Sequence, residues 1–245
     1  MIDFPHLDLD IKTVLFFNQF CGKSTFWDTL LLIFLSVDAI RTAILVALTV
    51  GIWEFGRAKK NIQARKRVIA ILFSIVLSLG IIEIMNAVID SKRPIVTYET
   101  QIKEPIRSYN TKQLWKDGWV RNAKHGSFPS DTVALLGTIA CGLFFWRKSI
   151  GIIAFLFVLF GGIIPRLYFG LHYPSDMLIG VLIAVLATFV VEKLKFLDIL
   201  GNSLINTYDK YPYIFGTLGF YLMYIIADKF ILLRQLPLWI KAMFQ

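Results

Sequence analysis

One short polar stretch, residues 165–176, places an arginine, a histidine and a carboxylate between two apolar runs. Charged groups beside a membrane interior are costly, so they usually have a function. Arg166 is a permanent cation whose guanidinium matches phosphate oxygens in a bidentate way. His172 is a candidate nucleophile, and Asp176 can hold its ring in one tautomer and leave the other nitrogen free to attack phosphorus. These residue types at this spacing favour phosphoryl transfer.

Two further polar segments carry the residue types that such a reaction needs. Lys92 and Arg93 follow an apolar run and are candidate phosphate ligands. Residues 126–132, Gly-Ser-Phe-Pro-Ser-Asp-Thr, lead into another apolar run. Ser130 is a good N-cap there, and the free N–H groups of a helix start bind anions. The three segments together predict a phosphate site built from positive charge and positioning, with no metal and no cofactor.

Each segment alone also has an ordinary structural explanation. An arginine and a proline after an apolar run, as at Arg93, are usual interfacial anchors. Residues 127–131 fit a plain helix start, and residues 166–176 fit an interfacial salt-bridge network. The order of the segments, their spacing and a common membrane face favour a joint site over three separate structural roles.

The elements that position these segments are predicted to be membrane-spanning helices. The 245 residues are 56% hydrophobic and 18% charged, which is typical of an all-α, polytopic helical membrane protein. The net charge of +9 does not indicate nucleic acid, because much of it lies in short clusters between apolar runs, where cytoplasmic loops carry Lys and Arg. The chain 1–245 is therefore expected to be a single integral-membrane domain.

About six spans are predicted. They are residues 39–55, 68–89, 133–146, 150–169, 177–191 and 213–227, the last within an extra C-terminal segment at about 211–230. The apolar run 26–37 is too short to cross a bilayer alone. The N-terminal residues 1–37 are therefore predicted to form interfacial or re-entrant helices at one membrane face.

The basic clusters orient this predicted bundle. Residues 57–67, 147–148 and 193–195 fall on one side, which the positive-inside rule assigns to the cytoplasm. The polar loop 90–128 and the turn 166–176 then share the opposite side. We therefore expect a multi-pass protein of the plasma (inner) membrane with its active site on the non-cytoplasmic face.

The three polar segments resemble the motifs of the type 2 phosphatidic acid phosphatase (PAP2) superfamily, which are Lys-x6-Arg-Pro, Pro-Ser-Gly-His and Ser-Arg-x5-His-x3-Asp. The matching positions are Arg93, Pro94, Pro129, Ser130, Arg166, His172 and Asp176. The resemblance covers about residues 10–195. It implies a six-span helical fold, a phosphohistidine intermediate at His172, and no metal cofactor.

The chain departs from the family pattern at four positions. Asn86 stands in place of the first-motif Lys, whose charge Lys92 can supply from a shifted position, and Pro165 stands in place of the third-motif Ser. In the second motif Asp131 replaces Gly and Thr132 replaces His. That His protonates the leaving alkoxide in the family, and threonine cannot do so near neutral pH.

Two explanations of Thr132 compete: lost activity, or a leaving group that needs no acid. A phosphate leaving from a diphosphate is far less basic than an alkoxide, so it needs protonation less. We therefore expect a lipid phosphatase acting on a lipid phosphate, with a polyprenyl diphosphate favoured as the substrate. His125 and Asp131 are candidate acid or base residues, although His125 also fits a solvated loop histidine.

Two alternatives stay open. The departures at Asn86 and Pro165 are also similar to a PAP2 branch of lipid phosphotransferases, which moves phosphate from undecaprenyl diphosphate onto lipid A. The protein would then pass phosphate to a lipid or glycan acceptor. A degenerate, non-catalytic protein that binds anionic lipid is the further alternative, and Thr132 is the residue that favours it.

Overall fold

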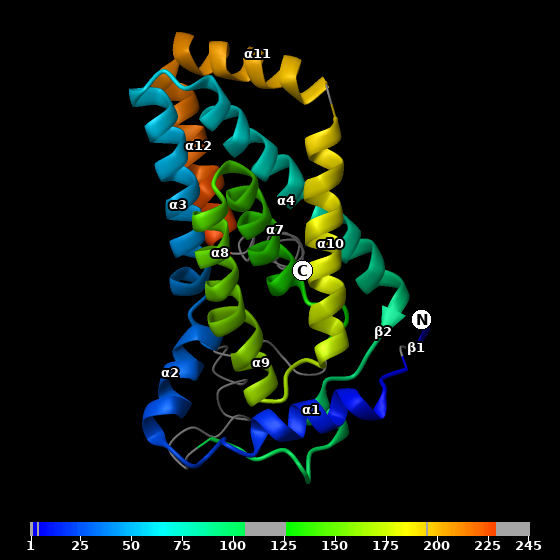
Figure 1. Ribbon diagram of the computed structural model, residues 1–245. Helices are drawn as coiled ribbons and strands as arrows, with labels where there is room; N and C mark the ends of the chain where they lie inside the picture. The colour runs from blue at the N-terminus through cyan, green and yellow to red at the C-terminus, as the bar shows by residue number, and fades with distance from the viewer. Residues whose placement is uncertain (1, 4, 106–125, 195, 229–245) are drawn as a thin grey trace, which may run out of the picture.

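Helices dominate the computed structural model, which describes residues 2–3, 5–105, 126–194 and 196–228. The long helices run along a common direction, whereas α1 (Asp8–Asn18) and α11 (Phe196–Lys210) lie across opposite ends (Figure 1). This arrangement confirms the all-α bundle predicted from composition. Among the described residues the strands are two short ones, β1 (Ile2–Asp3) and β2 (Ile89–Asp90), which pair in parallel.

Three described helices are long and apolar enough to cross a membrane: α4 (Ile62–Val88), the helix Lys148–Tyr168, and α10 (Pro174–Lys193). A fourth span exists if α2 (Thr25–Ser36) and α3 (Asp38–Ala58) form one broken span, since they meet at a bend of 58°. Length and composition therefore support three or four of the six predicted spans.

The other two predicted spans form shorter helices, α7 (Asp131–Trp146) and α12 (Pro212–Ala227). Each has 16 residues, fewer than the roughly 20 that a straight span requires. For α7 the reason lies in its position, because it packs against α4, α8 (Lys148–Phe157) and α10 at the centre of the bundle. It is a core helix surrounded by protein.

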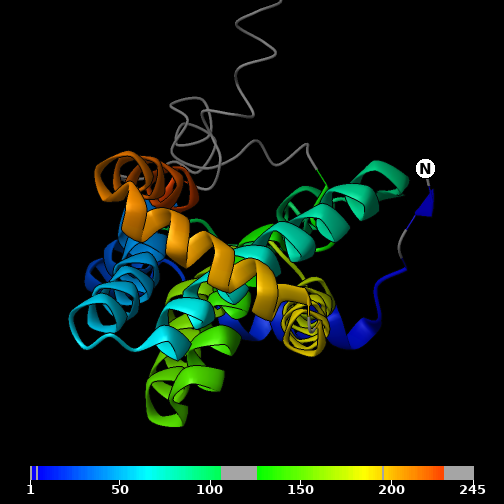
Figure 2. The same cartoon turned by 90° about the horizontal axis from the view of Figure 1, so that it is seen from above.

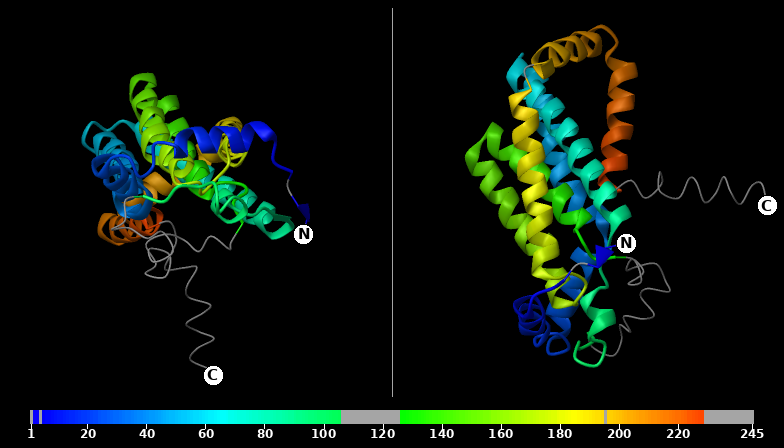
Figure 3. Two further views of the ribbon diagram at one scale, coloured as in Figure 1. Left: turned by 90° about the horizontal axis from the view of Figure 1, so that it is seen from below. Right: turned by 90° about the vertical axis from the view of Figure 1, so that its right-hand side faces the viewer.

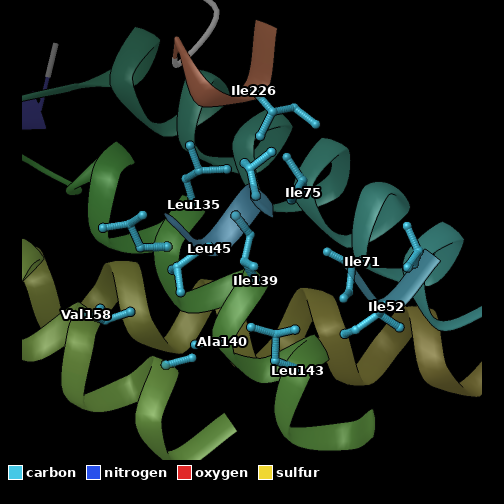
Figure 4. Packing of buried hydrophobic residues seen from close by; sticks show 14 of the residues in the cluster. Leu45, Ile52, Ile71, Ile75, Leu135, Ile139, Ala140, Leu143, Val158 and Ile226 are labelled. Carbon is cyan, nitrogen blue, oxygen red and sulfur yellow. The ribbon is translucent and has the colours of Figure 1, made fainter. Parts of the chain in front are cut away.

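The centre of the bundle is an apolar cluster around α7. Leu135, Ile139 and Leu143 of this helix pack with residues of α3 and α4, including Leu45 and Ile71 (Figure 4). Every residue of α7 from Thr132 to Leu143 is buried. This packing fixes the start of α7, where the second polar segment lies.

The predicted span 150–169 is one continuous helix with a change of winding inside it. The chain passes from α8 into one π-helical segment, η1 (Val158–Ile163), and then into α9 (Ile164–Tyr168). π-Helical turns inside helices occur frequently at functional sites. Here the π-helical segment ends three positions before Arg166.

Helix α11 was not predicted. It lies across the end of the bundle that carries the basic clusters (Figures 1 and 2). Ion pairs connect basic residues of α4 to acidic residues beyond α10 or at its end: Arg65 with Asp209, Lys66 with Asp198, and Arg67 with Glu192. The basic cluster at this end is therefore partly neutralised within the protein.

Helix α1 lies across the opposite end, against α9 and α10 (Figure 3), as expected for an interfacial helix. Asn18 fixes it: the Asn18 amide donates to the carbonyl oxygens of Tyr168 (2.8 Å) and Lys103 (3.0 Å). The Tyr168 hydroxyl in turn donates to the buried Asp28 of α2. The N-terminal helices thus hold α9, and with it Arg166, in place.

Candidate active site

Three segments that are far apart in the sequence meet at the α1 end of the bundle. One backbone hydrogen bond connects each pair of segments. These bonds are Ser127 N–H to Ser91 O (2.7 Å), Ser130 N–H to Asp176 O (3.1 Å) and Ile95 N–H to Gly170 O (2.8 Å). The residues around the start of α5 (Pro94–Thr97), those before α7, and the turn between α9 and α10 with the first residues of α10 therefore form one unit.

A glycine makes the turn between α9 and α10 possible. Gly170 has a φ of +63°, which is unfavourable for any residue with a Cβ. A Cβ there would also lie 3.0 Å from the Ile102 side chain. The Leu171 N–H donates to the Arg166 carbonyl oxygen (2.8 Å), which closes the turn and brings His172 into the protein.

His172 is 5% exposed, and both of its ring nitrogens have close neighbours. Nδ1 lies 2.8 Å from the carbonyl oxygen of Ser127. A carbonyl oxygen can only accept, so Nδ1 carries the proton and Nε2 keeps its lone pair. Nε2 lies 3.3 Å from Nη1 of Arg93. The geometry therefore leaves Nε2 as the unprotonated ring nitrogen, next to the Arg93 cation.

Asp176 is fully buried and lies behind His172. Its Oδ2 accepts from the Tyr173 N–H (2.8 Å) and lies 3.5 Å from Nδ1 of His172. Oδ1 has no hydrogen-bond partner among the described residues. The Ser127 carbonyl is therefore the nearer acceptor for Nδ1–H, and Asp176 adds negative charge behind the ring. The sequence assigned this role to Asp176 alone.

The surroundings of His172 set its protonation state. Burial lowers the pKa of His172 to about 4; Arg93 and Arg166 act in the same direction, and Asp176 opposes them. The imidazole is neutral at pH 7 as a result, which is the form that a nucleophile requires.

Two of the three predicted cations are buried beside the histidine. Arg93 donates from Nη1 to the Leu171 carbonyl oxygen (3.1 Å). Arg166 donates from Nη1 to the Gly162 carbonyl oxygen of η1 (2.7 Å). Backbone carbonyl oxygens accept hydrogen bonds from both guanidinium groups and so orient them. Lys92 is exposed, and it makes no hydrogen bond or ion pair with any residue that the structure describes.

The second segment provides a helix start, as predicted. Helix α7 begins at Asp131 with Ser130 at the N-cap, but the Ser130 side chain does not cap it. The buried Ser130 Oγ has no hydrogen-bond partner in the described chain, so its hydroxyl can serve a ligand. The Thr132 N–H and hydroxyl donate to Oδ1 of Asp131 (2.6 and 3.2 Å). That N–H is therefore not available to an anion.

The structure adds a third buried guanidinium that the sequence did not assign to the site. Arg41 of α3 is 0% exposed and donates to the Leu35 carbonyl oxygen (2.9 Å). Its charge interacts with those of Asp131 and Arg166. Asp131 therefore interacts electrostatically with two arginines from different helices. Asn86, at the first-motif Lys position, is exposed, and His125 lies outside the described residues.

The fold and these contacts define a helical membrane protein with a buried histidine surrounded by cations. The PAP2 superfamily matches residues 67–197, just over half of the chain, and this match includes all three polar segments. The chain belongs to the PAP2 superfamily. Comparisons with curated proteins and with solved structures found no match. Family membership supports a phosphatase-type function on membrane lipids and a membrane location for the apolar helices.

Proposed function

We propose that this protein is a membrane-embedded phosphatase that removes the terminal phosphate of a lipid phosphate, with a polyprenyl diphosphate as the favoured substrate, through a phosphohistidine at His172. One observation carries the proposal. The buried His172 directs Nδ1 to the Ser127 carbonyl oxygen (2.8 Å), which leaves the Nε2 lone pair beside Arg93. A neutral nucleophile next to an oriented cation suits attack on a phosphoryl group.

In the first step Nε2 attacks the terminal phosphorus. A P–N bond forms while the bridging P–O bond breaks, and its electron pair leaves with the lipid monophosphate. Arg93 and Arg166 bind the phosphoryl oxygens, with Ser130 and Lys92 as further ligands. The Ser127 carbonyl and Asp176 stabilise the positive charge that develops on the ring. Water then attacks phosphorus, the P–N bond breaks, and inorganic phosphate leaves with its protons shared with solvent.

The second motif supports a diphosphate over a monophosphate ester. Thr132 is buried and its hydroxyl donates to Asp131, so it offers no acid for a basic alkoxide. The leaving group of a diphosphate is a phosphate, which departs without strong acid assistance. Asp131 and His125 are the remaining candidates for acid or base catalysis.

Phosphotransfer is the second candidate function. It shares the phosphohistidine step but passes the phosphate to a lipid or glycan hydroxyl or phosphate instead of water. The departures at Asn86 and Pro165 favour it. A non-catalytic protein that binds anionic lipid is the third candidate, favoured by Thr132.

The arrangement of charge supports a non-cytoplasmic active site. The basic clusters and α11 occupy one end of the bundle, and the three polar segments occupy the other (Figure 1). Because cytoplasmic loops are rich in Lys and Arg, we place the site on the outer face of the plasma (inner) membrane.

One assay separates the three candidates. Purified protein is incubated with a polyprenyl diphosphate labelled on its terminal phosphate, in EDTA, with and without acceptor lipids. Free labelled phosphate in proportion to enzyme supports hydrolysis, and label found on an acceptor supports transfer. If neither the wild type nor His172→Ala shows any turnover, hydrolysis and transfer are both contradicted, and the non-catalytic protein is the remaining candidate.

A further inference from the structure

A second histidine, His6, lies against the segment that carries the nucleophile. It precedes α1, and its ring stacks on that of Tyr173, with the centroids 3.6 Å apart and the planes 22° from parallel. Tyr173 directly follows His172. His6 lies outside the family match at residues 67–197, so the motifs of the chain do not account for it.

Hydrogen bonds through Ser91 and Ser127, continued by the covalent structure of Ser127, connect His6 to His172. Nε2 of His6 lies 2.8 Å from the Ser91 hydroxyl, and that hydroxyl lies 2.8 Å from the Ser127 hydroxyl. The Ser127 carbonyl oxygen then accepts from Nδ1 of His172 (2.8 Å). Ser91 and Ser127 are each 1% exposed, so water does not replace these contacts.

Other contacts hold His6 in this position. Its Nδ1 lies 3.3 Å from the Ser175 hydroxyl and 3.9 Å from Oδ2 of Asp10. Asp10 is buried and accepts from the Ser175 N–H (3.0 Å). Strand β1, just before His6, pairs with β2, just before Ser91. The N-terminal segment is thus joined both to the first polar segment and to the start of α10.

We propose that His6 is a positioning residue for His172. Through Ser91 and Ser127 it fixes the carbonyl oxygen that holds Nδ1–H, and so it sets the direction in which the Nε2 lone pair points. The inference rests on the proposed role of His172 as nucleophile. His6 acts through two serines and not on the reacting atoms.

The positioning role of His6 predicts that kcat changes and that KM does not. Without the His6 contact the Ser91 hydroxyl loses a fixed partner, so its bond to the Ser127 hydroxyl is less well oriented and the carbonyl that orients His172 gains freedom. Loss of such a supporting contact, or misplacement of a reacting atom by about 1 Å, costs roughly 10–100-fold in rate. KM should stay within about twofold, because the cations that bind phosphate are unchanged.

Two variants separate the hydrogen bond from the ring stacking. His6→Phe keeps an aromatic ring against Tyr173 and removes the bond to Ser91. His6→Gln keeps a polar group that reaches Ser91 and removes the ring. We expect kcat on labelled polyprenyl diphosphate to fall in His6→Phe and to stay near the wild-type value in His6→Gln. Their melting temperatures in detergent monitor the fold.

The opposite order, with His6→Phe active and His6→Gln impaired, would show that stacking alone matters and would overturn the proposal. A second measurement needs no substrate. In the folded protein, the NMR resonance of the His172 Nδ1–H should shift in His6→Phe and not in His6→Gln. An unchanged resonance in His6→Phe would overturn the positioning role, even if the wild type proved to have no turnover.

Discussion

The residues around His172 support its proposed role as a nucleophile in two ways, through burial and through the backbone. Burial keeps the ring neutral, and a backbone carbonyl, that of Ser127, selects the tautomer. The nearby arginines are likewise oriented by backbone oxygens of Leu171 and Gly162. The site is therefore preorganised for a substrate that brings negative charge.

The lowered pKa of His172 predicts that activity persists to an unusually low pH. A histidine with an ordinary pKa near 6.5 loses about tenfold in its neutral fraction by pH 5.5. His172, with a pKa of about 4, stays neutral down to about pH 5. We expect kcat/KM, corrected for ionisation of the substrate, to stay level from pH 7 to about 5 and to fall near 4. A fall centred near 6.5 would contradict this environment for His172.

Thr132 tests the leaving-group argument. If the departing lipid monophosphate needs no acid, then Thr132→His should leave diphosphate turnover within about threefold of the wild type. The same variant should hydrolyse a lipid monophosphate ester faster than the wild type does, because the leaving alkoxide of that substrate needs a proton. Initial rates on the two substrates, measured side by side, give the comparison. A large loss on the diphosphate would count against the argument.

Side-chain type and spacing were sufficient to point to part of this candidate site. His172, Asp176, Arg93 and Arg166 carry charge or reactivity where apolar residues are expected, so the sequence reveals them. The Ser127 carbonyl has no such signal, because every residue has a carbonyl. His6 joins the site through contacts with Ser91, Tyr173 and Ser175, and Arg41 interacts with Asp131 and Arg166 through its charge, so in both cases the partners are far away in the chain. Their spacing follows no local period.

At the scale of helices, burial and length explain which helices were predicted correctly from the sequence and which were not. The long apolar run of α4 was recognised as a span because most of its faces are apolar. Helix α7 is equally apolar but shorter, since it is surrounded by protein. Helix α11 was missed because polar residues interrupt its short apolar pairs, so it contains no long apolar run, and it lies across the bundle end.

The ion pair that fixes α11 predicts a local loss of stability. Arg65 is buried between Trp53 and Tyr208, and its guanidinium donates two hydrogen bonds of 2.8 Å to Asp209. Asp209→Asn should lower the free energy of unfolding by about 1 kcal/mol, because a buried cation loses its counter-charge. Phosphatase activity should persist, since the site lies at the other end.

A neighbouring pair provides the control for this prediction. Lys66 and Asp198 lie 3.2 Å apart, and the Asp198 side chain is 73% exposed. Asp198→Asn should therefore cost less than about 0.5 kcal/mol. Unfolding in detergent, followed by circular dichroism, compares the two variants. Equal effects would show that burial of Arg65 does not matter.

At the scale of the whole molecule, one end is basic and the other carries the reactive segments. Lys92 and Lys59 are both exposed; Lys92 follows β2 in the first polar segment, and Lys59 follows α3 in the basic cluster at the other end. A membrane-impermeant thiol reagent should label Lys92→Cys in intact cells. It should label Lys59→Cys only after the cells are permeabilised. The native Cys21 and Cys141 are buried, so the unmodified protein serves as the background. The reverse pattern would place the site in the cytoplasm.

The central claim is that His172 carries the phosphoryl group. The most direct measurement is a rapid quench of purified protein with a terminally labelled polyprenyl diphosphate in EDTA, followed by peptide analysis under alkaline conditions, which preserve phosphohistidine. We expect acid-labile label on the peptide that contains His172, formed before free phosphate appears and absent in His172→Ala. Turnover without any label on His172, or an active His172→Ala variant, would contradict the account.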